Sequence, residues 1–564
     1  MNQPVDALVA AVASRAAERP DAPAFTALSY SGRDCLADVL TVGELHRAAG
    51  CLAEKIVATT RPGERVAILC GHGLNYVVAF LACLYADRVA VPLFPIQVNR
   101  NAGRLAAVLD DARPASSLVD PGAEARTEDS GFAVGKVLTV SAGPADCGIP
   151  PQPITGHPAY LQYTSGSTRT PAGVEVSHAN LVAALEQLRT GIPTVNTKPV
   201  VTWLPFFHDM GLVFALSLPL YTGVPAITLP PAEFAKRPIR WLRACSDYRA
   251  GATASPNFGL ALAVSATTPD ERAGLDLSEL DLVLNGAEPV RAEALAAFTK
   301  TLRPHGFRHS AHTAGYGLAE ATLPVTFGTP DQPPTTAEFD RAALAGGLAV
   351  LAAATGGIAL VGCGTPAGQH IRLVRTSGGE AEAGEVGEIW VRGPNVCSGY
   401  FGRPRETAAT FGAHLPGEGV TWLRTGDLGF LHDGQLYIAG RLTDMIVVAG
   451  RNHFPADIEA TAAGSAPEVR TGHIAAFGID DGIRETLILV AELNERRADA
   501  TAVARRIRSA VAAAHDIAPA DIVLVERGQI PKTSSGKLRR GECRRRYHRD
   551  ELIRAGEGKP AQAQ

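Results

Sequence analysis

The stretch YTSGSTRTPAGVEVSH, residues 163–178, combines hydroxyl residues and glycines between a strand-like run and a helix-like run. Glycine lets the backbone come close to an anion, and hydroxyl and N–H groups donate hydrogen bonds to it. This chemistry suits a loop that holds phosphate. The stretch has neither the GxxxxGK[ST] spacing of a Walker A loop nor a dinucleotide-binding fingerprint. Taken alone, a Ser/Thr/Gly stretch is more often a plain turn.

Two further clusters carry side chains suited to acid–base or metal chemistry. WLPFFHDMGLV (203–213) sets a His-Asp pair between apolar runs, although a satisfied structural histidine explains that pair equally well. TAGYGLAEATL places Tyr316 four residues before Glu320. The ring suits stacking on a base, and the carboxylate suits Mg²⁺, which prefers carboxylates and phosphates.

Four more stretches carry groups that suit a nucleotide and a second anion. LNGAEPV (284–290) ends a strand with Gly and Ala, so that its backbone could face a flat ring. TGDLG offers Asp427 at a turn, where a carboxylate suits ribose hydroxyls, and GRLTDMIVVAGRNHFPADIE carries Arg441. PKTSSGKLRR carries Lys537 in a Ser/Gly stretch. Each signal is weak alone, and their shared order and spacing make the stronger signal.

Alternating strand and helix patterns must position these groups. Residues 65–95 contain a buried-strand run (RVAILC), a helical run (NYVVAFLACLYA) and a second strand (VAVPLFP), which predicts a β-α-β unit. The alternation recurs up to DLVLNGAEP, with Ser177 as a helix N-cap. We therefore predict parallel or mixed sheets flanked by helices, with ligands at the carboxyl ends of the strands. A β-rich subdomain is expected after about 385, and a compact α+β segment after about 444.

Bulk composition narrows the class of protein. The chain has 564 residues, enough for at least two domains, and its net charge of −4 gives no global reason to expect nucleic-acid binding. Nine cysteines without a CxxC pair indicate reduced thiols in a cytoplasmic protein. The amino-terminal run reads as an amphipathic helix with Val5, Leu8, Val9 and Val12 on one face. The uncharged segment 342–369 contains paired glycines and lacks flanking basic or aromatic belts, so we expect a packed globular segment and no membrane span.

The motifs, taken in their order along the chain, resemble those of a known family of enzymes. YTSGSTRTPAGV, YGLAEATL, TGDLG, GRLTDMI and PKTSSGK match, in order, the core motifs of the adenylate-forming superfamily of acyl-activating ligases. Over essentially its whole length the chain resembles this superfamily. It is most similar to the fatty acyl-AMP ligases, whose sequence motifs include WLPFFHDMGLV, LNGAEPV and GRNHFPADIE. An extra segment with FDRAAL, before VGCGTPAG, also matches that branch, and ordinary acyl-CoA synthetases lack it.

The resemblance implies a domain division and a set of site residues. Residues 1–442 would form the adenylation domain with a branch-specific insertion at about 333–361, and residues 443–564 a lid domain that swings about Thr443. The implied catalytic residues are Lys537, bridging the carboxylate and the α-phosphate, His208 at the acyl–phosphate junction, and Glu320, which helps to hold Mg²⁺ together with Thr164. The implied ATP-binding residues are Thr164, Ser165, Gly166, Ser167 and Thr168 at the phosphates, Gly286, Ala287 and Tyr316 around the adenine, and Asp427 and Arg441 at the ribose. Asn285, Glu288, Gly317, Leu318 and Ala319 are implied to bind ATP as well.

The phosphate loop departs from the superfamily at two positions. Arg169 and Ala172 stand where most relatives have Gly and Lys, and that lysine normally contacts the outgoing phosphates. The RTPAG sequence also occurs in fatty acyl-AMP ligases, so the absence of the lysine does not indicate an inactive enzyme. It leaves the β- and γ-phosphates to hydroxyls, backbone and Mg²⁺, and two alternatives stay open for Arg169: it replaces the lysine, or it lies at the rim of the site.

The leading hypothesis is that a fatty acid and ATP give acyl-AMP and pyrophosphate. The resemblance implies that the insertion restrains the lid, so that coenzyme A is used poorly and the acyl group passes to the phosphopantetheine of an acyl carrier protein on a polyketide or nonribosomal peptide synthase. The rivals are an acyl-CoA synthetase with an unusual insertion and a non-catalytic acyl-adenylate binder. The acyl pocket is expected near residues 254–262 and Trp203, and a monomer is the default. LRRGECRRRYHRD could dock an acidic carrier, although a solvated basic helix is the favoured interpretation.

Overall fold

The computed structural model describes most of the chain. Its described residues are 6–32, 34–96, 102–143, 148–163, 171–353, 357–448, 451–480, 485–494, 499–533 and 537–555. The expected amphipathic helix is α1 (Ala7–Glu18), which buries Leu8, Val9 and Val12, while Val5 lies outside the described residues. All eight cysteines in these ranges are free thiols.

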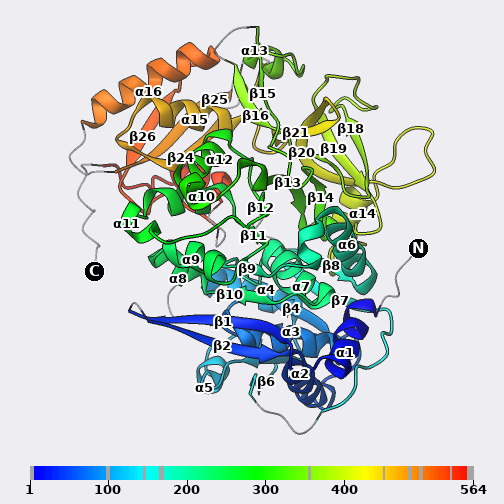
Figure 1. Cartoon of the computed structure of the whole chain (residues 1–564). Coiled ribbons are helices and arrows are strands. Elements are labelled where there is room, and N and C mark those ends of the chain that lie inside the picture. The colour runs from blue at the N-terminus through cyan, green and yellow to red at the C-terminus, as the bar shows by residue number, and fades with distance from the viewer. Residues whose placement is uncertain are drawn as a thin grey trace, which may run out of the picture.

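Two large sheets form the amino-terminal region, in the lower and central parts of Figure 1. The first sheet has the strand order β6-β5-β3-β4-β7-β8, and the second has the order β17-β14-β13-β12-β11-β9-β10-β1-β2. The strands of the first sheet are β3 (Arg65–Ile68), β4 (Val89–Pro92), β5 (Ser116–Val119), β6 (Lys136–Thr139), β7 (Pro158–Tyr163) and β8 (Gly173–Ser177). Those of the second are β1 (Pro23–Ser31), β2 (Asp34–Thr41), β9 (Val200–Thr202), β10 (Ala226–Thr228), β11 (Ala252–Ala254), β12 (Leu282–Asn285), β13 (His312–Leu318), β14 (Leu323–Phe327) and β17 (Thr365–Pro366).

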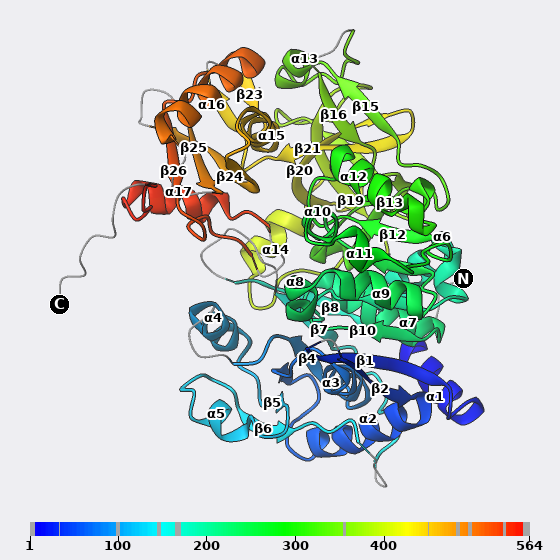
Figure 2. The same ribbon diagram turned by 60° about the vertical axis from the view of Figure 1, so that its left-hand side comes forward.

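The predicted β-α-β unit belongs to the first sheet, and its helix lies between the two sheets. Strands β3 and β4 pair in parallel, as expected, and α3 (Leu74–Tyr85) connects them. Every residue of α3 from Tyr76 to Tyr85 is buried. A helix that is apolar on all sides must be covered on all sides, and α3 contacts β1 of one sheet as well as β3 and β4 of the other. Figure 2 shows α3 in this position.

Other helices pack around the two sheets (Figures 1 and 2). They are α2 (Val42–Val57), α4 (Ala102–Ala112), α5 (Glu124–Glu128), α6 (His178–Gly191), α7 (Leu218–Thr222), α8 (Pro231–Lys236), α9 (Ile239–Asp247), α10 (Asn257–Ser265), α11 (Pro269–Arg272) and α12 (Ala292–Leu302). The predicted N-cap is confirmed at α6, where the Ser177 hydroxyl accepts from Asn180 N–H and the Asn180 side chain reaches back to the cap.

The β-rich subdomain is an antiparallel sheet in the order β18-β19-β20-β21. It begins at residue 370, earlier than the expected 385, with β18 (His370–Val374), β19 (Gly387–Arg392), β20 (Leu423–His432) and β21 (Gln435–Arg441), and it carries α14 (Pro404–Phe411). The predicted insertion forms a hairpin of β15 (Thr336–Phe339) and β16 (Ile358–Val361) with α13 (Arg341–Ala345) between the strands.

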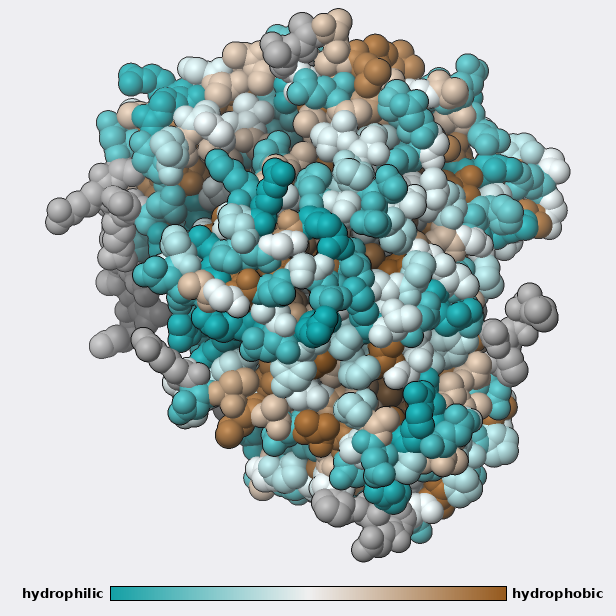
Figure 3. All heavy atoms as spheres, viewed as in Figure 1, coloured by the Kyte–Doolittle hydropathy of each residue, from teal (hydrophilic) through white to brown (hydrophobic). Residues whose placement is uncertain are grey.

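The uncharged segment is less packed than expected. Leu344 is buried, but Leu348, Val350 and Leu351 are each about half exposed. Figure 3 shows apolar surface near the top of the molecule, where Figure 1 places α13. Within the ranges given above, no helix is both long and apolar enough to cross a membrane.

The carboxyl-terminal region has a hydrophobic core of its own, which includes Ile446, Ile458, Leu489 and Ile507. Its sheet has the order β24-β25-β26. The elements are β22 (Ile446–Val448), β23 (Arg451–His453), α15 (Pro455–Ser465), β24 (Val469–Asp480), β25 (Glu485–Leu493), α16 (Ala500–His515), β26 (Asp521–Val525) and α17 (Arg540–His548). The exact domain boundary between residues 442 and 443 stays a prediction.

Candidate active site

The predicted phosphate loop lies between two neighbouring antiparallel strands. Strand β7 ends at Tyr163 and β8 begins at Gly173, its pairing partner. Thr164, Ser165, Gly166, Ser167, Thr168 and Arg169 lie outside the described residues. The base of the loop is held by side chains that the motif analysis missed: Tyr163 donates to Asp111 (2.7 Å), and Arg403 donates to Asp111 (2.8 Å) and to the carbonyl of Pro171 (2.9 Å).

His208 and Asp209 stand at the start of a buried π-helix, η2 (Met210–Ser217). His208 Nδ1 lies 2.7 Å from Asp209 Oδ1, and the same oxygen accepts the N–H of Met210 at 2.7 Å. Burial alone would raise the pKa of Asp209. The charge and hydrogen bond of His208, the charge of Lys537 and the Met210 N–H outweigh burial and hold this pKa below its ordinary value. Asp209 therefore stays ionised and fixes the orientation of the imidazole.

Lys537 belongs to the carboxyl-terminal region, and its positive charge contributes to the lowered pKa of Asp209. A shared role of Lys537 and His208 at the reacting groups stays a prediction. The Lys537 backbone N–H donates to Thr533 Oγ1 (3.0 Å), and the Thr533 N–H donates to the Lys537 carbonyl (2.8 Å). The lysine thus sits on a loop that is closed by its own hydrogen bonds.

Glu320 follows β13 in a tight turn. Thr322 and Leu323, just beyond it, have φ angles of 47° and 89°, which non-glycine residues rarely adopt. Glu320 Oε1 accepts from the hydroxyl of Tyr400 at 2.9 Å. Burial raises the pKa of Glu320, against the opposing hydrogen bond from Tyr400. A cation bound beside the Glu320 carboxylate would favour its ionised form. Glu320 is therefore suited to serve as a ligand of Mg²⁺.

Tyr316, Asp427 and Arg441 form one connected group. The Tyr316 hydroxyl donates to Asp427 Oδ2 (2.8 Å), and Arg441 Nε donates to Asp427 Oδ1 (2.8 Å). Asp427 and Arg441 are direct partners on β20 and β21. Because each carboxylate oxygen has a donor, the aspartate is held rigidly beside the Tyr316 ring. The three residues predicted at the adenine and ribose are therefore adjacent in space.

The remaining predicted ATP-binding residues lie at the ends of β12 and β13. Asn285 is fully buried, and neither of its side-chain polar atoms has a partner within the described ranges. A Cβ at Gly286 would lie 2.9 Å from the Gly315 carbonyl, so glycine permits this close approach. Ala287 has a φ of 69°. The Glu288 carboxylate accepts the Phe258 N–H at 3.3 Å and so has a structural partner already.

The tail of the same motif, residues 317–319, also requires close packing. A Cβ at Gly317 would meet the Leu323 carbonyl at 1.7 Å. Ala319 is buried and Leu318 is half-buried. These residues place the β13 turn against β14, and a ligand role for their backbone stays a prediction.

An aromatic cluster lies where the acyl pocket was expected. Trp203 stacks on Phe234 with ring centroids 3.9 Å apart and meets Phe258 edge-on at 5.6 Å. Trp203 is buried, and its indole N–H has no partner within the ranges described. Trp203 and residues 254–262 are therefore neighbours, and an acyl pocket beside them stays a prediction.

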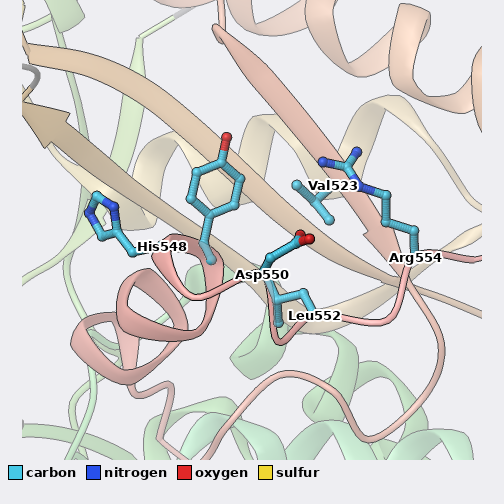
Figure 4. A pocket seen from close by; sticks show the side chains of 6 residues that line it. Val523, His548, Asp550, Leu552 and Arg554 are labelled. Atoms are coloured by element: carbon cyan, nitrogen blue, oxygen red, sulfur yellow. The ribbon is translucent and has the colours of Figure 1, made fainter. Parts of the chain in front are cut away.

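A separate hollow of about 290 Å³ lies on the carboxyl-terminal region and contains none of the predicted site residues. Figure 4 shows the side chains that line it, Val523, Tyr547, His548, Asp550, Leu552 and Arg554. The basic run next to it is partly neutralised, because Arg540, Arg545 and Arg546 all pair with acidic side chains. This pairing favours the structural interpretation of α17.

The fold and the grouped side chains define an adenylate-forming enzyme. Residues 12–401 match the family described as AMP-binding enzyme, and residues 443–555 match the AMP domain of Disco-interacting protein 2-like proteins. The chain is 39% identical over 95% of its length, and over 96% of the relative, to the long-chain-fatty-acid–AMP ligase FadD26 of Mycobacterium marinum. It is also 39% identical to the long-chain-fatty-acid–AMP ligase FadD28 of Mycobacterium tuberculosis, over 98% of this chain and 99% of the relative.

A solved structure agrees with this assignment. The fatty acyl-adenylate ligase from L. pneumophila, in complex with acyl adenylate and pyrophosphate, superposes with a TM-score of 0.75 at 32% identity and 97% coverage of both chains. The chain belongs to the AMP-binding enzyme family, in its fatty-acid–AMP ligase branch.

Proposed function

We propose that this protein joins a fatty acid to AMP, with release of pyrophosphate, and then passes the acyl group to the phosphopantetheine arm of a carrier protein. One observation supports the first step above all. The charge of Lys537, from the far end of the chain, contributes to the lowered pKa of Asp209, which is paired with His208 at 2.7 Å in the large region. A cation at that position is what a carboxylate and an α-phosphate need in order to approach each other.

The residues would divide the work without covalent chemistry. Phosphoryl-type transfer needs positioning and charge stabilisation more than a protein nucleophile. Asp427, held by Tyr316 and Arg441, would orient the ribose and adenine. Lys537 would neutralise the two reacting anions, and His208, oriented by Asp209, would donate a hydrogen bond at the acyl–phosphate junction.

Glu320 fits the expected Mg²⁺. Within the described ranges no group of three or more His, Cys, Asp or Glu side chains could hold a metal by itself. Mg²⁺ needs only one or two protein carboxylates when substrate phosphates complete its shell. Glu320 supplies one such carboxylate, and Thr164 is the second proposed ligand. When bound, the ion would neutralise charge on the phosphates.

An ion pair ties the insertion to the lid and supports a carrier protein as the acceptor. Arg341 of α13 donates from Nε to Asp457 Oδ2 (2.6 Å) and from Nη2 to Asp457 Oδ1 (3.0 Å). Asp457 belongs to α15 of the carboxyl-terminal region and is buried. A bidentate fork is the strongest geometry for such a pair. It would resist the lid rotation that coenzyme A use requires.

Breaking this fork should relax the choice of acceptor. We expect Arg341→Ala to raise acyl-CoA formation several-fold while acyl-adenylate formation changes by less than about twofold, because single bidentate contacts of this type are worth roughly 1–3 kcal/mol. The measurement is acyl-CoA and acyl-AMP production with coenzyme A present. Arg375→Ala, which removes a 2.7 Å pair with Glu385 in the β-rich subdomain, is the matched control. Equal acyl-CoA rates in Arg341→Ala and wild type would contradict a restraining role.

A product survey tests the proposed function directly. A panel of saturated fatty acids is incubated with ATP and Mg²⁺, alone, with coenzyme A, and with a phosphopantetheinylated carrier protein. We expect acyl-AMP in all three mixtures, acyl-carrier in the third and little acyl-CoA in the second. Robust acyl-CoA turnover would favour an acyl-CoA synthetase, and the absence of any adenylate would leave a non-catalytic binder.

A further inference from the structure

The chain passes from the large region to the lid through a short segment whose two ends are held differently. On the side of the large region, Arg441 pairs with Asp427, and the Leu442 N–H donates to the Gly426 carbonyl at 2.9 Å. Both contacts join the segment to β20. Residues up to 442 are therefore part of the large region.

On the lid side, Asp444 is held by a different partner. Arg540 Nη1 donates to Asp444 Oδ2 at 3.0 Å. The same guanidinium forms a fork with Glu459, from Nε to Oε1 (2.7 Å) and from Nη2 to Oε2 (2.8 Å). Glu459 lies in α15, is only 3% exposed, and also accepts the Ala476 N–H of β24 at 3.0 Å. Asp444 is therefore joined through one arginine to the interior of the lid.

Arg540 also stands at the end of the loop that carries the lysine. It lies three residues after Lys537. The Arg539 N–H donates to the Pro531 carbonyl (3.0 Å), which closes the base of that loop. One side chain therefore connects the first residue beyond the predicted hinge at Thr443 with the base of the Lys537 loop.

We propose that Arg540 is a positioning residue for adenylate formation, which links the lid side of the hinge, at Asp444, to the Lys537 loop through the buried Glu459. This inference rests on the proposed function. Leu442 is tied to the large region and the Asp444 side chain to the lid, so rotation of the lid acts on the torsions around Thr443. The same rotation must break the bonds from the Asp444 and Met445 N–H groups to the Arg441 carbonyl (3.2 and 3.1 Å). The link makes the Lys537 loop move with Asp444 as one body, so the hinge angle sets where the ammonium stops.

The chemistry of the link requires arginine. Its planar fork satisfies both oxygens of Glu459 and still has a nitrogen for Asp444, whereas lysine offers a single point charge. Arg540→Lys keeps the charge and most of the volume but cannot hold both carboxylates in this geometry. A shift of about 1 Å in a positioned group can cost on the order of 100-fold in rate.

The experiment measures pyrophosphate release with dodecanoic acid, ATP and Mg²⁺ for wild type, Arg540→Lys, Lys537→Ala and the double variant. We expect Arg540→Lys to lower kcat by on the order of 10- to 100-fold. KM for ATP should stay within about twofold, because the proposed nucleotide contacts lie in the large region. In the double variant, Arg540→Lys should add less than about a twofold loss to that of Lys537→Ala, because both changes remove the same contribution.

Controls separate positioning from folding. Arg506→Lys alters an exposed pair with Glu468 in the same region (2.5 Å) and should leave kcat unchanged. If Arg540→Lys does not fold, Asp444→Asn replaces it, with a smaller loss in kcat expected and the same lack of additivity. Unchanged kcat, or full additivity with Lys537→Ala, would overturn the inference. Wild type that releases no pyrophosphate would instead refute the proposed function.

Discussion

Replacing Lys537 with alanine is expected to slow acyl-adenylate formation by a factor on the order of 10²–10³, comparable to the loss of one preorganised donor in a site that excludes water. The reacting carboxylate and α-phosphate are both anions, and without the ammonium they repel each other at the moment of attack. The charge of Lys537 contributes to the lowered pKa of Asp209, next to His208, where this junction is proposed. The measurement is fatty-acid-dependent pyrophosphate release at saturating ATP.

The second half-reaction supplies the internal control. Transfer of the acyl group from added acyl-AMP to a phosphopantetheine thiol does not bring two such anions together, so Lys537→Ala should change it by less than about threefold. Lys236→Ala, at an exposed position outside the site, should leave both half-reactions at the wild-type rate. Equal losses in the two half-reactions would mean that the lysine supports the fold of the lid and not adenylation.

Glu320→Gln is expected to lower adenylate formation by at least on the order of 100-fold at low Mg²⁺, with partial recovery at high Mg²⁺, because charge stabilisation by a bound metal is worth several kcal/mol. Glutamine keeps the size and an acceptor for the Tyr400 hydroxyl but lacks the negative charge. The measurement is a Mg²⁺ titration of pyrophosphate release. A loss that does not depend on the Mg²⁺ concentration would remove Glu320 from the metal site.

The Tyr400 hydroxyl separates orientation from charge. Tyr400→Phe removes the 2.9 Å hydrogen bond to Glu320 and leaves the carboxylate in place, so a loss of less than about tenfold in the rate of adenylate formation is expected.

Burial raises the pKa of Glu320, and protons compete with the metal for the same oxygen. The Mg²⁺ requirement of the wild type should therefore increase as the pH falls, and that of Glu320→Gln should not.

Local patterns were enough for much of the fold. The apolar runs within residues 65–95 predicted β3, α3 and β4. Strands of a parallel sheet are buried on both faces and therefore need continuous apolar sequence. Ser177 predicted the start of α6, because helix capping depends on residues within a single turn. The start of the β-rich subdomain was placed too late, since β18 carries only a short alternating pattern (HIRLV).

Contacts between distant segments could not be read in the same way. Asp209 lies in the WLPFFHDMGLV motif. Only the fold shows that it pairs with His208 and that the charge of Lys537 contributes to its lowered pKa. Nothing in the local sequence singles out Asp111, Arg403 or Tyr400, which are ordinary polar residues until the chain brings them beside the phosphate loop and Glu320. The role of Arg540 depends likewise on two carboxylates far away along the chain.

The sequence by itself determined the order of the motifs, and through it the family, because the chemistry of adenylation demands the same residue types wherever the chain places them. It also determined the strand and helix periods, which depend on near neighbours. Only the tertiary structure decided which charges meet. Hydrogen bonds form only at donor–acceptor distances of about 3 Å, and coulombic interactions weaken as charges separate and are screened by salt. Arg341 and Asp457, or Arg540 and Asp444, therefore acquire a role only when folding removes the distance between them.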